Sequence, residues 1–148
     1  MMAKTLVLGI TSMLMLGGDA SAIEPLNLNF DTDEPPTFTR ELVIEQIIQM
    51  KSEEHEVDGD LAQAIAFCES TYRQYASNGQ VLRGIENSKD VGLFQINEKY
   101  HLDKSREMGY DIYSLEGNID YAMELLKKDG SRHWSASKPC WNNKVAVR

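Results

Sequence analysis

The pattern of apolar and polar positions at the start of the chain is typical of an exported protein. Lys4 precedes an apolar run from Thr5 to Leu16, and the small residues Ala20-Ser21-Ala22 follow it. This pattern predicts a cleaved secretory signal peptide at residues 1–22, because the run is too short for a comfortable membrane span; an uncleaved anchor is the alternative. Residues 23–38 are polar and acidic and contain three of the four prolines, which predicts a flexible leader before the folded domain.

Apolar residues at helical spacing predict four helices within residues 39–148, each bounded by a capping residue or a helix breaker. The first expected helix begins at Arg40 after Thr39 and ends before segment 52–60, and the second begins at Asp58 or Asp60 and ends at about Tyr72. The third runs from Asn97 to Gly109, and the fourth from Ser114 to Gly130. The first helix rests on the pattern of Leu42, Val43, Ile47 and Met50. With one small β element, the fold class predicted is α+β, mostly helical.

The second expected helix carries an acidic residue on its apolar face. Leu61, Ile65 and Cys68 recur at helical spacing, and Glu69 stands one turn after Ile65 on the same stripe. An isolated ionised carboxylate in an apolar setting is costly, so its pKa rises and it tends to stay protonated. A general acid needs that protonated form near neutral pH. The alternative is a solvated Glu69, or one paired with Arg73 at i+4, and the spacing leaves both open.

Residues 81–97 are expected to form a small, irregular hairpin around a polar turn from Glu86 to Lys89. Strict alternation from residue 90 onward would place Asp90 and Gln95 on opposite faces of a strand. The two side chains share a cleft only if the strand bends or ends between them, and Gly92 permits such a bend. The bland alternative is a strand with an aspartate at its turn and polar residues at its far end.

Charge and cysteine content narrow the class of partner and compartment. The net charge of −8 disfavours nucleic acid and anionic membranes as partners. Export makes a disulfide between Cys68 and Cys140 plausible, which would tie the helix of Glu69 to the C-terminal tail. Closing so long a loop stabilises the fold by about 4 kcal/mol on the chain-entropy model. Two reduced thiols are the alternative.

The remaining chemically capable residues favour structural roles. The histidines His55, His101 and His133 have no metal-ligand spacing with the cysteines, so we expect no metal site and no cofactor. The two tryptophans, Trp134 and Trp141, have the chemistry to stack on sugar rings. Packing of the tail beside the second cysteine is the favoured role, since aromatic side chains usually serve cores.

Two segments together resemble the lysozyme superfamily. The sequence "CES" at 68–70, followed by "DVGLFQIN" at 90–97, resembles the catalytic helix and β-hairpin of lysozymes. The bacterial lytic transglycosylase domains of the SLT type share the E-S pair and the G-L-x-Q-I motif found at 92–96. The segment "GNIDYAMELL" at 117–126 is similar to the helix that follows in this superfamily. The resemblance covers about residues 40–141.

This resemblance implies a lysozyme-like domain at residues 39–148 that cleaves the β-1,4 bond between N-acetylmuramic acid and N-acetylglucosamine in peptidoglycan. Glu69 would be the general acid. Three residues match motif positions that line or shape the cleft, and they equally suit holding the hairpin against the helix: Ser70, Gln95 and Asn97. Asp90 resembles the second carboxylate of animal-type lysozymes, which would support hydrolysis. Lytic transglycosylases work with a single Glu and form a 1,6-anhydro product, which would leave Asp90 as a turn residue.

The sequence also departs from both subfamilies. Leu125 stands where transglycosylases usually carry a tyrosine, their A-Y-N-A-G segment is absent, and animal-type lysozymes normally have four disulfides. Two other functions stay open: a catalytically silent glycan-binding module, and a wall-opening accessory of an envelope-spanning secretion machine. In each case we expect an exported monomer that contacts peptidoglycan glycan strands in the periplasm, the cell envelope or outside the cell.

Overall fold

The computed structural model describes residues 39–146. Its elements, in chain order, are α1 (Arg40–His55), α2 (Gly59–Ser70), β1 (Asp90–Val91), β2 (Ile96–Asn97), α3 (Glu98–Glu107), α4 (Leu115–Asp129), η1 (Gly130–Ser137) and α5 (Lys138–Val145). Helices make up 64% of the structure, and the two strands form one antiparallel sheet, so the predicted α+β, mostly helical fold is confirmed. The predicted signal peptide at 1–22 and leader at 23–38 lie outside the described residues.

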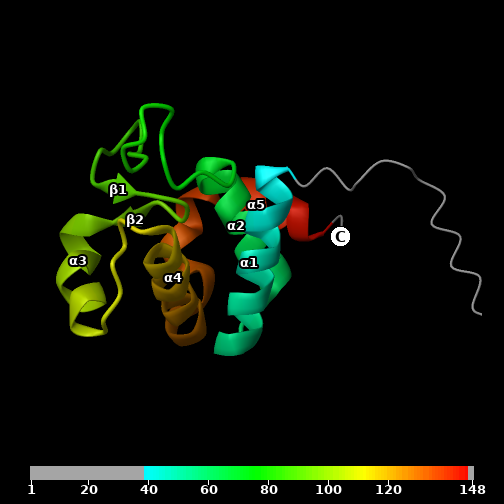
Figure 1. The fold of residues 1–148 in the computed structure, drawn as a ribbon. Helices are drawn as coiled ribbons and strands as arrows, with labels where there is room; N and C mark the ends of the chain where they lie inside the picture. Colours follow the sequence, from blue (N-terminus) through cyan, green and yellow to red (C-terminus); the bar gives the residue numbers. More distant parts are fainter. Residues whose placement is uncertain (1–38, 147–148) are drawn as a thin grey trace, which may run out of the picture. The chain divides into compact units, whose positions relative to one another are not determined.

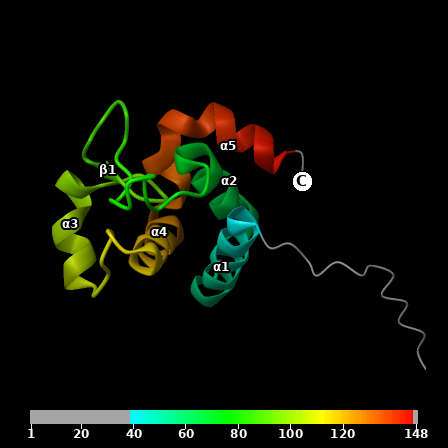
Figure 2. The same ribbon diagram turned by 45° about the horizontal axis from the view of Figure 1, so that its top comes forward.

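Helix α2 is the centre of the fold, between α1 on one side and α5 on the other (Figures 1 and 2). Its middle turns, residues 62–66, are buried on every side, and three of these five residues are alanines. Small side chains let neighbouring helices approach closely, and the polar residue of this segment, Gln63, donates to the Glu45 carbonyl oxygen of α1 at 3.4 Å. The buried side chain of Ile65 joins the core that α1, α4 and the hairpin build around this helix. Among the described helices, none has the length and apolarity to cross a membrane.

The helix boundaries follow from capping side chains, as the sequence predicts. The four N-terminal caps accept backbone N–H groups of the first turn through their side-chain oxygens: Thr39 for α1, Asp58 for α2, Asn97 for α3 and Ser114 for α4. Gly109 adopts a left-handed φ of 85° just after α3, and Gly130 ends α4. These predicted starts and stops are therefore confirmed.

Two expectations for α1 need correction. Helix α1 buries Ile44 and Ile48, and of the expected apolar stripe only Ile47 packs against the core, while Leu42, Val43 and Met50 are exposed. Among the described elements, α2 and α4 pack against this helix, and it continues to His55 instead of ending before residue 52. Helix α2, expected to run to about Tyr72, ends at Ser70, because the chain reverses through consecutive left-handed residues.

The C-terminal tail is helical, although the apolar pattern predicts its last clear helix between Ser114 and Gly130. η1 and α5 follow directly, and the indoles of Trp134 and Trp141 are buried within them. Trp134 Nε1 donates to the Phe94 carbonyl oxygen at 2.8 Å, and Trp141 Nε1 donates to the Trp134 carbonyl oxygen at 2.9 Å. The tryptophans thus pack the tail, as expected, and Trp134 also joins it to the hairpin turn.

The hairpin is short and strongly bent. Asp90 pairs with Asn97 in the β1–β2 ladder, and an isolated bridge joins Arg83 to Val91 across the polar turn expected at residues 86–89. Strict alternation beyond Val91 does not hold, because residues 92–95 form a turn with left-handed φ angles at Gly92 and Gln95. The bend that Gly92 was expected to permit is present.

Buried amides hold this turn against α4. Asn118 is fully buried, accepts the Phe94 N–H at 2.9 Å and donates to the Val91 carbonyl oxygen at 3.1 Å. Gln74 accepts the Leu93 N–H at 2.8 Å. A Cβ on Gly92 would lie 2.4 Å from Gln74 Oε1, so this position requires glycine for both space and backbone angle. The turn is therefore fixed by side chains far from it in sequence.

Candidate active site

Glu69 lies in the last turn of α2, where the buried helix meets the surface. Its carboxyl group is partly buried, and burial raises the pKa of Glu69 above its ordinary value. The hydroxyl of Ser137 donates to Glu69 Oε1 at 2.5 Å and opposes this rise, while the charge of Asp90 adds to it. The pKa of Glu69 is raised overall, so the protonated form persists to higher pH than in an exposed glutamate.

Two adjoining pockets, with volumes of about 360 Å³ and about 520 Å³, meet at Glu69. Both pockets are lined by the same five residues: Glu69, Asn87, Asp90, Gln95 and Ala136. The smaller pocket continues past Tyr100, Leu125 and Trp134, and the larger continues past Arg73 and Ile85. The carboxyl group thus stands partway along an open cleft, an arrangement that suits an extended polymer better than a small enclosed ligand.

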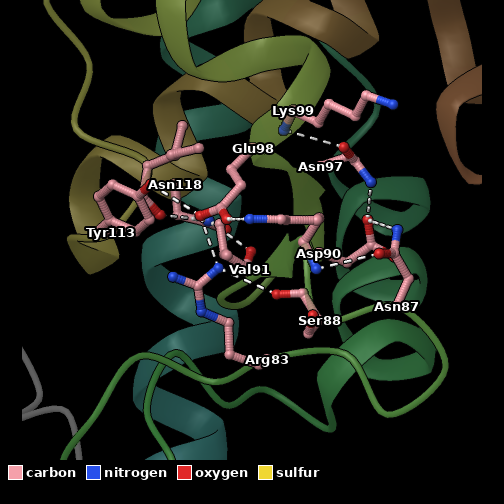
Figure 3. A network of polar contacts seen from close by, with 12 residues as sticks. Arg83, Asn87, Ser88, Asp90, Val91, Asn97, Glu98, Lys99, Tyr113 and Asn118 are labelled. Atoms are coloured by element: carbon pink, nitrogen blue, oxygen red, sulfur yellow. Dashed lines mark hydrogen bonds and ion pairs between the residues drawn. The ribbon is translucent and has the colours of Figure 1, made fainter.

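Asp90 and Asn97 are joined across the start of the hairpin. Asn97 Nδ2 donates to Asp90 Oδ1 at 2.6 Å, and Asn87 Nδ2 donates to the same oxygen at 3.1 Å (Figure 3). The other end of the Asn97 amide caps α3 by accepting the Lys99 N–H. Asp90 is therefore a hydrogen-bond acceptor fixed in the cleft wall, and Asn97 links that wall to α3.

The other two motif residues have different surroundings. Gln95 lines both pockets, and its Nε2 donates to the Gly92 carbonyl oxygen at 2.8 Å, which closes the turn. Ser70 is buried and is not among the residues that line the two pockets. Its hydroxyl donates to the Ala66 carbonyl oxygen and accepts the Arg73 N–H, so it shapes the end of α2. The structure brings Gln95 into the cleft and keeps Ser70 beneath it.

The alternative in which Arg73 neutralises Glu69 does not match the geometry. Arg73 Nε donates to the Ser70 carbonyl oxygen at 2.8 Å, and within residues 39–146 no ion pair joins Arg73 to Glu69. The guanidinium group caps the helix end instead. Glu69 is thus left with a hydroxyl partner and without a cationic one in the described part of the chain.

A polar network that no sequence pattern predicts supports the cleft wall. Glu98 accepts from Arg83 Nη1 at 2.6 Å, from Lys89 Nζ at 3.0 Å and from the Tyr113 hydroxyl at 2.9 Å (Figure 3). These donors lower the pKa of Glu98 to about 2, with Arg83 as the largest cause. Arg83 also donates to the Ser88 carbonyl oxygen. One carboxylate therefore ties the loop that carries Asn87 to α3, and no local pattern marks Glu98 for this role.

The far end of the smaller pocket holds a pair of histidines. The rings of His101 and His133 lie 5.2 Å apart, and His101 Nδ1 lies 3.1 Å from the Tyr121 hydroxyl oxygen. Burial, and then the proximity of His133, lower the pKa of His101. His133 contacts Asp129 at 3.0 Å. The described residues contain no cluster of ligands able to hold a metal ion.

Cys68 and Cys140 form a disulfide that joins α2 to α5. The bond attaches the tail one residue before Glu69 and three residues after Ser137. Ser137 was not among the predicted site residues. The C-terminal tail therefore supplies one side of the site as well as covering the core.

The domain is mostly helical α+β, and its cleft lies between the central helix and a small hairpin. It holds a glutamate whose pKa is raised. These features are those of the lysozyme-like class. A model of the transglycosylase SLT domain matches residues 46–136, which is more than half of the chain. The chain belongs to the transglycosylase SLT domain family. Members of this family are lytic transglycosylases, glycosyl-transferring enzymes that act on peptidoglycan. No curated protein and no solved structure matches the chain.

Proposed function

We propose that this protein cleaves the β-1,4 bond between N-acetylmuramic acid and N-acetylglucosamine in peptidoglycan, with Glu69 as the general acid. The observation that carries the proposal is the place of Glu69, partly buried where two pockets meet, in a domain of the SLT family. Burial raises the pKa of Glu69, which favours the protonated form that a general acid needs.

The proposed reaction is a lytic transglycosylation. The Glu69 proton goes to the glycosidic oxygen, and the bond between that oxygen and C1 of the muramic acid breaks. The 6-hydroxyl of the same muramic acid attacks C1, and its proton passes to the Glu69 carboxylate. The product is a 1,6-anhydromuramic acid end, no water is consumed, and Glu69 returns to its starting form. One carboxyl group thus acts as acid and then as base.

In this proposal Asp90 supports Glu69 and does not attack the sugar. Its Oδ1 is occupied by the Asn97 and Asn87 amides, and its charge raises the pKa of Glu69. Gln95 and Asn97 complete the wall of the cleft. Hydrolysis is the second candidate, since Asp90 lines the same cleft as Glu69 and could stabilise a cationic sugar.

We also propose that the domain 39–148 acts outside the cytoplasm after removal of a signal peptide at residues 1–22. The disulfide supports this compartment, because disulfides persist in oxidising surroundings. N-terminal sequencing of the exported protein should begin at Ile23. An N-terminus at Met1 on exported protein would overturn the cleavage proposal and leave the catalytic proposal untouched.

Mass spectrometry of purified peptidoglycan, digested with the purified protein, tests the reaction. We expect soluble fragments with 1,6-anhydromuramic acid ends, and none from Glu69→Gln. The matched control, Glu116→Gln, removes an exposed carboxylate from the first turn of α4 and should digest normally. Fragments with reducing muramic acid ends would show that the reaction is hydrolysis and not transglycosylation. No fragments from the folded, oxidised protein would favour a glycan-binding module.

A further inference from the structure

The hydroxyl of Ser137 lies between two oxygen acceptors. It is within hydrogen-bond distance of Glu69 Oε1, at 2.5 Å, and of the Trp134 carbonyl oxygen, at 3.1 Å. A serine hydroxyl has one proton to donate and two lone pairs that accept. Ser137 therefore donates to only one of these oxygens at a time, and the shorter distance favours Glu69 Oε1.

The contact suits both protonation states of Glu69. When Glu69 is ionised, Ser137 donates to the carboxylate at Oε1. When Glu69 carries its proton on Oε2, Oε1 is a carbonyl oxygen that still accepts from Ser137, and the acidic proton stays free for the glycosidic oxygen. The Trp134 carbonyl oxygen accepts Trp141 Nε1 at 2.9 Å, so it keeps a partner while Ser137 donates to Glu69. No buried polar atom of this group loses its partner when the proton moves, and leaving one unpaired would be costly.

We propose that Ser137 is a positioning residue for Glu69, whose hydroxyl donates to Oε1 in both protonation states and so leaves Oε2 to give up and regain the catalytic proton. The inference rests on the proposed function, in which one carboxyl group serves as acid and then as base. The hydroxyl supplies a hydrogen bond to both forms without a movement of the backbone. It also holds Oε1 in one place while the proton is transferred, which favours a productive geometry.

The surrounding structure holds Ser137 in position. The disulfide anchors the tail at Cys140, next to the helix of Glu69. The indoles of Trp134 and Trp141 fix the other side of the same turn. The family match ends at residue 136, so Ser137 and this anchor lie beyond the segment that the family model covers.

Other charged groups near Glu69 do not take this role. The charged or imidazole side chains that line the two pockets with Glu69 are Arg73, Arg83, Glu86, Asp90, His101 and His133. Among the described residues, Ser137 alone donates a hydrogen bond to Glu69, and Asp90 acts on it through charge. Lys138 and Lys144 of α5 are not among the residues that line either pocket.

Titration of the Glu69 carboxyl carbon by ¹³C NMR, on the full chain without substrate, tests the inference. A hydrogen bond to a carboxylate is stronger than one to the neutral acid, so Ser137→Ala should move the titration of Glu69 to higher pH. Ser137→Thr keeps a hydroxyl and should restore wild-type behaviour. Ser135→Ala, two residues away on an exposed side chain, is the matched control and should change nothing.

Initial rates of muropeptide release across pH provide the second readout. Ser137→Ala should lower the rate about tenfold, the scale of one lost hydrogen bond to a charged group, and move the alkaline limb upward. An unchanged Glu69 titration in Ser137→Ala would overturn the inference, and so would a rate loss that Ser137→Thr fails to restore. Glu69→Gln assigns the NMR signal and tests the proposed function separately, because retained cleavage in that variant refutes the catalytic role whatever the titration shows.

Discussion

Replacing Glu98 with glutamine should destabilise the protein in a pH-dependent way. The change keeps the size of the side chain and removes its charge, so it isolates the ion pairs with Arg83 and Lys89. Those pairs fix the loop that carries Asn87 against α3. Because Asn87 lines the cleft, the same ion pairs stabilise the fold and hold the cleft wall in place.

The expected size follows from the surroundings of the carboxylate. The pKa of Glu98 falls from 4.5 to about 2, a difference that corresponds to roughly 3 kcal/mol if nothing screens the charges. The Glu98 side chain is only 13% exposed, but its partners Arg83 and Lys89 are 43% and 58% exposed, so water and salt weaken both pairs. We therefore expect Glu98→Gln to lower the free energy of unfolding by about 1–2 kcal/mol at neutral pH.

The sign of the pH dependence follows from the lowered pKa. A carboxyl group with a lower pKa in the folded state stabilises the fold above its unfolded pKa, and this contribution is lost as pH falls toward the folded value. The stabilisation from Glu98 is thus complete above about pH 4.5 and declines toward about pH 2. Urea unfolding of both proteins at about pH 6 and about pH 2.5 should show the difference shrinking to less than half.

The control is Glu107→Gln, at the other end of α3. The Lys104–Glu107 pair is 60% and 67% exposed, so its loss should change stability by less than about 0.5 kcal/mol at either pH. An equal loss of stability for Glu98→Gln at both pH values would refute the reasoning, because it would trace the effect to packing and not to charge.

Three further predictions use the same unfolding measurement. Asn118→Ala should cost about 3 kcal/mol, since it leaves the buried Phe94 N–H without its acceptor and removes a donor from the carbonyl oxygens of Val91 and Ile112; a loss below about 1 kcal/mol would mean that water replaces the amide. Gly92→Ala should cost about 3 kcal/mol, whereas Gly109→Ala, with a left-handed φ but open space around it, should cost about 1 kcal/mol; equal losses would contradict the clash. The double variant Cys68→Ser with Cys140→Ser should lose up to about 4 kcal/mol, and unchanged stability would contradict the chain-entropy argument.

Features with a local physical cause could be predicted from the sequence. The caps at Thr39 and Asp58 depend on a side chain within three residues of the N–H that it accepts, so their types and spacing suffice. The apolar stripe expected for α1 is wrong for Leu42 and Met50, which are apolar but exposed, and right for Ile47, because periodicity does not distinguish a covered face from an open one.

The candidate site was predictable only in part. A carboxylate on an apolar stripe marks Glu69 as a candidate within a single helix, and the resemblance of the E-S and G-L-x-Q-I motifs selects it over the solvated alternative. Ser137 could not be predicted, since nothing in its neighbourhood distinguishes it from Ser135 until the tail folds back onto α2. The same holds for Glu98, whose donors Arg83 and Tyr113 lie fifteen residues away on either side. These contacts depend on tertiary placement, which local patterns do not encode.

The tail explains why the site extends beyond the family segment. The match to the family model ends at residue 136, before Ser137 and both Cys140 and Trp141. Ser137 places its hydroxyl next to Glu69, and Cys140 anchors this segment through the disulfide. Trp141 donates a hydrogen bond to the Trp134 carbonyl oxygen. The carboxyl group thus comes from the segment shared with the family, while the hydrogen bond that tunes it comes from outside that segment. Because the disulfide lies beside both, formation of that bond in an oxidising compartment would stabilise the fold and order the site in a single step.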